Sequence, residues 1–165
     1  MTIHSDHMSS SIVSREKIGI AGAYYVAGEL SQRGYIATLT SRNTKGVDIL
    51  VASHDGLRTV SIQVKTSSSM SPSRKWPFHD KDEHIFSSNL YYALVHLRSG
   101  NVKPDIYIVP SKFVAEYIRK SHADWLLKRS IRGQEHRDNP MRTFKFETDL
   151  IAFQYLDKWE NLGLE

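Results

Sequence analysis

Three side chains of complementary chemistry lie close together in the segment between residues 45 and 69. Asp48 offers a carboxylate, Gln63 an amide oxygen and Lys65 an ammonium group. Mg²⁺ prefers hard oxygen ligands and keeps several waters, so one or two carboxylates and a substrate phosphate suffice to hold it. An ammonium group beside such a cation can orient the attacking water and stabilise the charge of a transition state. These residue types therefore indicate metal-assisted hydrolysis of a phosphodiester.

The segment that carries these three residues is predicted to form a β-hairpin. Asp55-Gly56 is a strong signal for a two-residue turn. Around it, β-branched residues of one face pair with each other: Val51 with Val60, Ile49 with Ile62, and Val47 with Val64. On the other face the same register places Asp48 opposite Gln63, with Lys65 two residues further on. The hairpin alone should therefore bring the three polar groups together.

A predicted helix over residues 14–33 adds a fourth candidate, Glu29. Ser14 is a suitable N-cap, and Gly34 stands where a glycine commonly ends a helix. Glu29 falls on the apolar stripe of this helix, where a carboxylate is costly unless it has a partner. We therefore expect Glu29 to complete the metal site, directly or through water.

A structural interpretation of the hairpin is also open. An aspartate at the start of a strand is common, as are glutamine and lysine on a solvent-facing side. Asp48 and Lys65 would then form a surface ion pair that contributes little to stability.

The remaining sequence predicts a single α/β domain over residues 14–165, after a disordered or tag-like stretch at 1–13. Further strands are expected at 35–41, 90–97, 105–110 and 143–146, and further helices at 111–127 and 149–162. Residues 67–88 are predicted to form a loop rich in serine, proline and charged residues.

The chemistry-bearing residues resemble the motifs of the PD-(D/E)XK nuclease superfamily. Glu29 lies on the first predicted helix, "GVD" ends in Asp48, and "IQVKT" holds Gln63 and Lys65. That superfamily, which includes archaeal Holliday junction resolvases, has an acidic residue on its first helix, an aspartate opening its second strand and E-x-K on its third. Its core runs helix, three strands, helix, strand. The resemblance covers residues 14–69, and beyond them it rests on the order of the elements.

This resemblance implies a restriction-endonuclease-like fold, with a central mixed sheet of about five strands flanked by helices. It also implies Mg²⁺ or Mn²⁺ as cofactor, Asp48, Gln63 and Glu29 as metal ligands, and Lys65 as the catalytic lysine. Val47 replaces the proline of the superfamily's name, and Gln63 replaces the usual acid. Because a neutral amide is a weaker Mg²⁺ ligand than a carboxylate, the affinity for the metal should be lower.

Basic and aromatic residues elsewhere are candidates for contacts with nucleic acid. Lys75 and Trp76 would touch a strand, since an exposed aromatic ring can stack on a base. A plug of Trp76, Pro77 and Phe78 over the core is an equal alternative, and the basic run after residue 127 would equally suit a solvated loop. The full set of predicted contacts is Lys45, Lys75, Trp76, Arg129, Arg132, Arg137 and Arg142.

Two other groups of residues are weaker candidates. The loop "RKWPFHDKDEHIF" (74–86) crowds together imidazole and carboxylate groups that suit Zn²⁺ or Mn²⁺, but their spacing favours a solvated charged loop. Ser67, Ser68 and Ser69 show no His–Asp partnership in the sequence, so no serine nucleophile is predicted. We expect His96, within a predicted strand, to be structural.

Composition narrows the setting. The chain is 40% hydrophobic and 24% charged, as in an ordinary globular protein, and its formal charge of +4 mildly favours a polyanionic partner. The sequence lacks an apolar run near the roughly 18 residues of a membrane span and lacks a signal-peptide pattern, so no membrane partner is expected. It contains no cysteine, which fits a cytoplasmic location.

The sequence therefore predicts a metal-dependent nuclease, with DNA as the expected substrate. By analogy we expect a homodimer, because two active sites are needed to cut both strands. The alternative is a catalytically weakened nuclease fold that acts as a nucleic-acid-binding or protein-interaction module.

Overall fold

The computed structural model describes residues 14–41, 46–68, 74–100, 102–128 and 133–165. Its helices and strands are α1 (Arg15–Gln32), β1 (Ile36–Leu39), β2 (Ile49–Ala52), β3 (Thr59–Ser68), β4 (Trp76–His79), β5 (Leu90–Leu97), β6 (Asp105–Pro110), α2 (Ser111–Leu127), β7 (Met141–Phe144) and α3 (Asp149–Phe153). Two 3₁₀ turns complete the set, η1 (Asp80–His84) and η2 (Trp159–Leu162). Among the described residues, no helix has both the length and the apolar character needed to cross a membrane.

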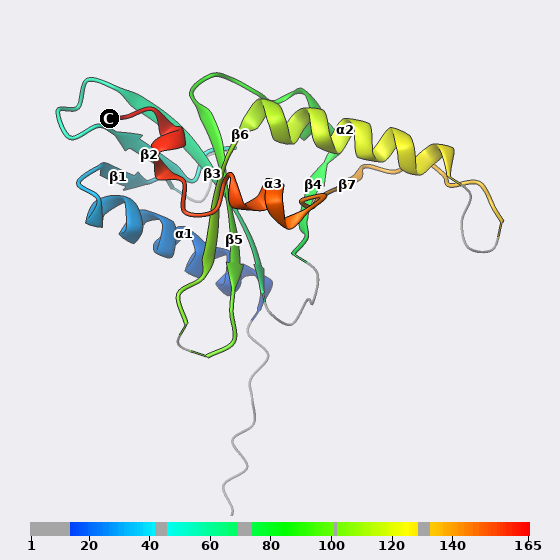
Figure 1. Ribbon diagram of the computed structural model, residues 1–165, viewed down its shortest axis with the longest axis horizontal. Coiled ribbons are helices and arrows are strands. Elements are labelled where there is room, and N and C mark those ends of the chain that lie inside the picture. The colour runs from blue at the N-terminus through cyan, green and yellow to red at the C-terminus, as the bar shows by residue number, and fades with distance from the viewer. Residues whose placement is uncertain (1–13, 42–45, 69–73, 101, 129–132) are drawn as a thin grey trace, which may run out of the picture.

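A five-stranded mixed sheet forms the centre of this α/β fold, with strand order β1-β2-β3-β5-β6 and helices on both faces (Figure 1). β3 and β5 are parallel, and the other neighbours in the sheet are antiparallel. The predicted α/β class with a mixed sheet flanked by helices is confirmed.

The connection between β3 and β5 is neither the loop predicted from the sequence nor the helix implied by the resemblance. Residues 67–88 were predicted to be a loop, yet they contain β4 and η1, and β4 pairs with β7 in a separate two-stranded sheet. In the described part of this connection no α-helix occurs, and the next helix, α2, follows β6. The helix that the resemblance implies after the third strand is therefore missing from the described residues, and β4 with η1 takes its place in the order.

Helix α1 forms where the sequence predicts it. Ser14 caps its first turn, and Gly34, at a φ of 85°, follows its end. Gly22 faces the sheet so closely that an added Cβ would lie 2.0 Å from the hydroxyl oxygen of Thr66. Glycine at this position therefore allows the middle of α1 to approach β3.

The β2–β3 hairpin has the predicted register but a longer loop. The paired residues are Ile49 with Ile62, Leu50 with Ser61, Val51 with Val60, and Ala52 with Thr59. The N–H of Ser53 donates to the carbonyl of Arg58 at 2.9 Å, so residues 54–57 make a four-residue connection in place of the predicted two-residue turn. The predicted turn at residues 55–56 and the observed loop at residues 54–57 have the same centre, so the predicted pairing of the two strands is unchanged. Gly56 supplies the positive φ, 74°, that this loop requires.

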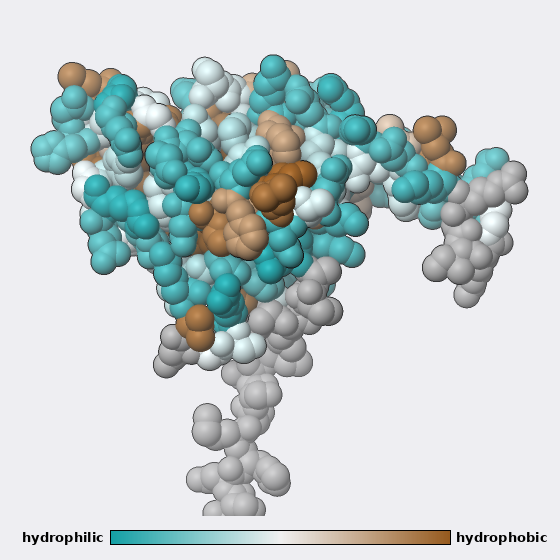
Figure 2. Space-filling model, viewed as in Figure 1, coloured by the Kyte–Doolittle hydropathy of each residue, from teal (hydrophilic) through white to brown (hydrophobic). Residues whose placement is uncertain are grey.

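On one face of the sheet, α2, α3 and the β4–β7 pair cover an aromatic core. Trp76, Phe78, Tyr92, Tyr107 and Phe144 are fully buried there. Helix α3 contributes Ala152 to this core and leaves Leu150 and Phe153 exposed. An apolar patch is visible over α3 in Figure 2.

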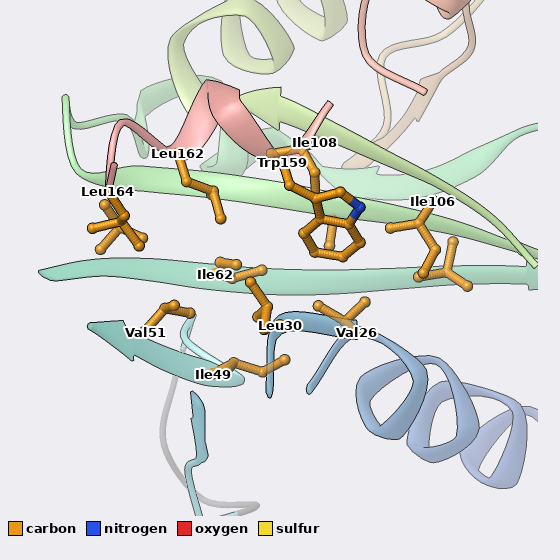
Figure 3. Close-up of a cluster of buried hydrophobic side chains, with 13 residues drawn as sticks. Val26, Leu30, Ile49, Val51, Ile62, Ile106, Ile108, Trp159, Leu162 and Leu164 are labelled. Atoms are coloured by element: carbon orange, nitrogen blue, oxygen red, sulfur yellow. The ribbon is translucent and has the colours of Figure 1, made fainter. Parts of the chain in front are cut away.

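On the other face, α1 and the C-terminal segment enclose an aliphatic core (Figure 3). Residues 149–162 were predicted to form one helix, but they divide into α3 and η2. Asp157, at a φ of 52°, donates its N–H to the carbonyl of Ile106 at 2.8 Å and so pairs with β6. That break lets Trp159 and Leu162 turn into the core beside Val26 and Ile62.

Candidate functional site

Asp48 lies at the point where β2 and β3 separate. Its N–H donates to the carbonyl of Ile62 at 2.9 Å, and its Oδ2 accepts the N–H of Val64 at 2.7 Å. The pairing of β2 with β3 ends at Ile62, so the Asp48 carboxylate stands where the next strand partner would be. Asp48 is thereby fixed against the β3 backbone between Gln63 and Lys65.

Gln63 and Lys65 project from the face of β3 opposite α1. In the parallel pairing with β5, Gln63 is the partner of Tyr92 and Lys65 the partner of Leu94, and both partners belong to the aromatic core. Val64, between them, packs against the aliphatic core below α1. The predicted sharing of one face by Gln63 and Lys65 agrees with this alternation.

Lys65 is half-buried, and its ammonium group has an aromatic and acidic environment. The Nζ lies 4.9 Å from the centre of the Phe78 ring. Burial lowers the pKa of Lys65, with a small contribution from Lys81, while the carboxylates of Asp82 and Asp48 oppose that shift. Sequence reasoning missed Phe78 and Asp82 as neighbours of Lys65, because β4 and η1 reach it only through the tertiary fold.

A cavity of about 570 Å³ opens beside Asp48, between the first half of α1 and the ends of β1 and β2. Its lining residues are Glu16, Gly19, Ile20, Ala23, Tyr24, Leu39, Thr40, Ser41, Asp48 and Val64. Glu16 is therefore a second carboxylate at this cavity, and sequence reasoning did not select it. The three- and four-residue spacing of Glu16, Gly19, Ile20 and Ala23 was a usable signal for one helix face.

Glu29 lies elsewhere. It forms a close ion pair with Arg33 and a second with Lys103, whose Nζ is 3.4 Å away. Partial burial alone would raise the pKa of Glu29, but the bond from Arg33 and the charge of Lys103 together lower it. At a rise of about 1.5 Å per residue, Glu29 is roughly 20 Å along the helix from Glu16. The cost of a carboxylate on this stripe is thus offset by two cations, and the predicted convergence of Glu29 with Asp48 is not found.

Within the described residues, no cluster of three or more histidine, aspartate or glutamate side chains is arranged to hold a metal ion. A Mg²⁺ ion at Asp48 would therefore depend on fewer carboxylates. The Asp48 carboxylate, together with water and a substrate phosphate, has the oxygen chemistry that this ion prefers, whereas Gln63 projects from the opposite face of β3 and does not line the cavity.

The charged loop around η1 does not gather its imidazole and carboxylate groups. Glu83 forms a close ion pair with Arg142, and Asp82 accepts the backbone N–H of His79 at 2.9 Å. The ion pair holds η1 against β7, and the bond to Asp82 caps the first turn of η1. They favour a structural role over the Zn²⁺ or Mn²⁺ site that the composition of the loop allows.

Trp76 is part of the core, in agreement with the alternative of a plug. Its side chain is fully buried, its ring packs on Tyr107 and Phe144, and its Nε1 donates to the carbonyl of Val95 at 3.0 Å. Its ring is therefore not available to stack on a base. Lys75, the preceding residue, is exposed.

The basic residues after α2 have separate roles. Arg142 is buried, and besides its ion pair with Glu83 it donates to the carbonyl of Asn139 at 2.5 Å. A phosphate contact would require breaking those bonds, so we withdraw the prediction for Arg142. Arg137 is exposed, as the prediction requires. The predicted contacts Lys45, Arg129 and Arg132 lie outside the described residues.

Ser67 has a histidine partner that the sequence did not reveal. Its Oγ lies 2.9 Å from Nδ1 of His96 on the neighbouring strand. Asp105 faces His96 across β5 and β6, but Arg98 holds that carboxylate through two bonds of 2.5 and 3.2 Å. Ser67 is also buried, so its hydroxyl is not accessible to a substrate. The contact between Ser67 and His96 is consistent with the structural role predicted for His96.

Searches of protein-family models, of curated proteins and of solved structures each found no match to this chain. Membership of the PD-(D/E)XK superfamily stays a prediction, carried by Asp48, Gln63 and Lys65.

Proposed function

We propose that this protein is a metal-dependent nuclease that hydrolyses phosphodiester bonds in DNA. The observation that carries the proposal is the bond from the Val64 N–H to the Asp48 carboxylate. It holds an acid beside the backbone between an amide and a half-buried lysine. A carboxylate, a neutral oxygen donor and an amine in that order suit a hard divalent cation and the phosphate it would bind.

Each residue would have a distinct part. A bound Mg²⁺ or Mn²⁺ ion would polarise the scissile phosphate and lower the pKa of a coordinated water. Asp48 would be the principal ligand and Gln63 the second, with Glu16 taking the supporting role first predicted for Glu29. Lys65 would hydrogen-bond the attacking water or a phosphate oxygen. Its lowered pKa means that it gives up a proton more readily than an ordinary lysine.

A cleavage assay with the full chain tests this function. Single- and double-stranded DNA, and RNA as a comparison, would be incubated with Mg²⁺ or Mn²⁺ and with a chelator. Asp48→Asn and Lys65→Ala should each lower the cleavage rate by at least about a hundredfold. Lys112→Ala, which removes an exposed charge on α2 away from the site and from the predicted nucleic-acid contacts, is the control and should cleave normally. Cleavage that survives the chelator, or that both site variants retain in full, would show that this site is not responsible.

One observation favours a second candidate, a nucleic-acid-binding module without catalysis. Lys65 lies over Phe78 on the aromatic side of β3, whereas the cavity beside Asp48 lies on the α1 side. If this separation persists with substrate, the amine cannot assist the reaction. This candidate predicts binding that weakens steeply with added salt, with no metal-dependent cleavage of any strand tested.

A further inference from the structure

The cavity beside Asp48 has two chemically different ends. Asp48 and Glu16 supply carboxylates, whereas Ile20, Ala23 and Leu39 supply an apolar wall. A phosphodiester group alone would bind at the acidic end, through a cation, and would make no contact with the apolar wall. The second end therefore points to an apolar or aromatic part of the same ligand.

Tyr24 stands at the apolar end. It lines the cavity and is 64% exposed, and Leu39, on the β1 side, is 39% exposed. An exposed aromatic ring beside a phosphate-binding site is the arrangement on which unpaired bases stack, because every base offers a π-face. Isolated exposed apolar residues are common, but here one borders the only cavity among those described that also contains Asp48.

The dimensions allow a ligand of this kind. The volume of about 570 Å³ lies within the range of cavities that hold small organic ligands. The space exists partly because two small residues, Gly19 and Ala23, face it from α1. A Cβ added at Gly19 would meet no atom within 4 Å, so the α1 backbone leaves open space at this position.

We propose that this cavity receives one unpaired nucleotide, with its base stacked on Tyr24 and its phosphate held at Asp48. This inference rests on the proposed nuclease function and specifies its substrate class. A base inside a duplex has neighbours on both faces and cannot offer one to Tyr24 unless it leaves the stack. The preferred substrate is therefore a single strand, or a site where a nucleotide is unpaired.

The charges of the site make this binding dependent on the metal. The carboxylate of Asp48 would repel a phosphate in the absence of a cation. Stacking on Tyr24 needs no cation. Removal of the divalent ion should therefore weaken binding without abolishing the contribution of Tyr24.

Tyr25 provides a matched control. It is the adjacent residue of α1, carries the same side chain and is 48% exposed. It lies on the outward groove of α1 with Gly28, Glu29 and Gln32 and does not line the Asp48 cavity. Tyr24 borders both the groove and the cavity, whereas Tyr25 borders the groove alone. A loss of binding in Tyr24→Ala that does not occur in Tyr25→Ala is therefore due to the cavity.

The test measures binding without cleavage. In the Lys65→Ala variant with Mg²⁺, fluorescence anisotropy would compare a labelled single strand of about ten nucleotides with its duplex, a length that covers one single-strand site. The single strand should bind more tightly. A further Tyr24→Ala change should weaken single-strand binding roughly five- to 150-fold, the usual contribution of one stacked base. Tyr24→Phe keeps the ring, and with Tyr25→Ala it should stay within about twofold of the parent.

The outcomes separate this inference from the nuclease proposal. Loss of single-strand binding in Tyr24→Ala alone supports the nucleotide site, even if the wild-type protein cleaves nothing and the nuclease proposal fails. Equal binding by Tyr24→Ala and Tyr25→Ala overturns the inference, as does a duplex that binds as tightly as the single strand, and metal-dependent cleavage would survive either result. Unchanged thermal midpoints would show that the variants are folded.

Discussion

The carboxylate of Asp48 accepts the backbone N–H of Val64 at 2.7 Å. A side chain thus satisfies a donor of β3 that β2 no longer reaches. The same contact holds the acid beside the strand that carries Gln63 and Lys65, so one hydrogen bond serves both the end of the hairpin and the candidate site.

Asp48→Asn separates these two roles. The amide oxygen can still accept the Val64 N–H, so the free energy of unfolding should change little, while the loss of charge should lower cleavage at least about a hundredfold. Asp48→Ala should lose the same activity and cost about 1 kcal/mol more, because the N–H loses its partner. Urea denaturation and cleavage rates measure the two effects. Equal stabilities for the two variants would mean that the bond does not contribute.

The approach of α1 to β3 gives a prediction about stability. Gly22→Ala places a methyl group against Thr66 and should destabilise the protein by about 1–3 kcal/mol. Gly28→Ala, on the same helix, meets no atom within 4 Å and should stabilise it by up to about 1 kcal/mol through helix propensity. Chemical denaturation of the two variants compares them, and a Gly22→Ala protein as stable as Gly28→Ala would contradict the close packing.

Burial of Trp76 predicts a structural effect where the sequence suggested a binding one. Trp76→Ala should cost about 3–5 kcal/mol, because it empties the aromatic core and removes the bond to Val95. Lys75→Ala should stay within about 0.5 kcal/mol of wild type. Urea midpoints measure both. A stable Trp76→Ala protein with weakened DNA binding would restore the stacking role.

His96 predicts a dependence of stability on pH. Burial lowers the pKa of His96 from its usual 6.5, helped by Arg74 and Arg98 and opposed by Asp105. The folded state therefore binds this proton less well than the unfolded chain, so its contribution is complete above pH 6.5 and is lost as the pH falls through the folded pKa.

The thermal midpoint should accordingly fall between about pH 7.5 and about pH 5, and it should fall less in His96→Gln, whose side chain does not titrate. Equal slopes for the two proteins in this range would mean that His96 is protonated as easily in the folded protein as in the unfolded chain.

Much of the fold was readable from local patterns. The boundaries predicted for β5, β6 and α2 match the structure, and the register of β2 and β3 follows from their β-branched pairs. Strict alternation and clear capping residues carry this information within a few positions of the chain. The break at Asp157 depends on a bond to β6 and left no comparable local signal.

The candidate site was predictable only where one hairpin determines it. The β2–β3 hairpin holds Asp48 against β3 at Val64, between Gln63 and Lys65 in the chain, but the cavity at Asp48 lies on the α1 side, whereas Lys65 lies over Phe78 on the opposite side. The choice of helical acid needed the rotation of α1 against the sheet. Glu29 lies on the apolar stripe of α1, as predicted, but it forms ion pairs with Arg33 and Lys103. Because Lys103 is distant in the sequence, this pairing could not be predicted from local patterns.

The most direct test of the central claim is an anomalous difference map from a crystal of the protein soaked in Mn²⁺. The account predicts a peak within bonding distance of the Asp48 carboxylate, about 2.1 Å for a small hard cation, with the Gln63 amide or a β3 carbonyl as a further ligand. A well-ordered site with no peak at Asp48, or with Mn²⁺ bound only at other carboxylates, would contradict it.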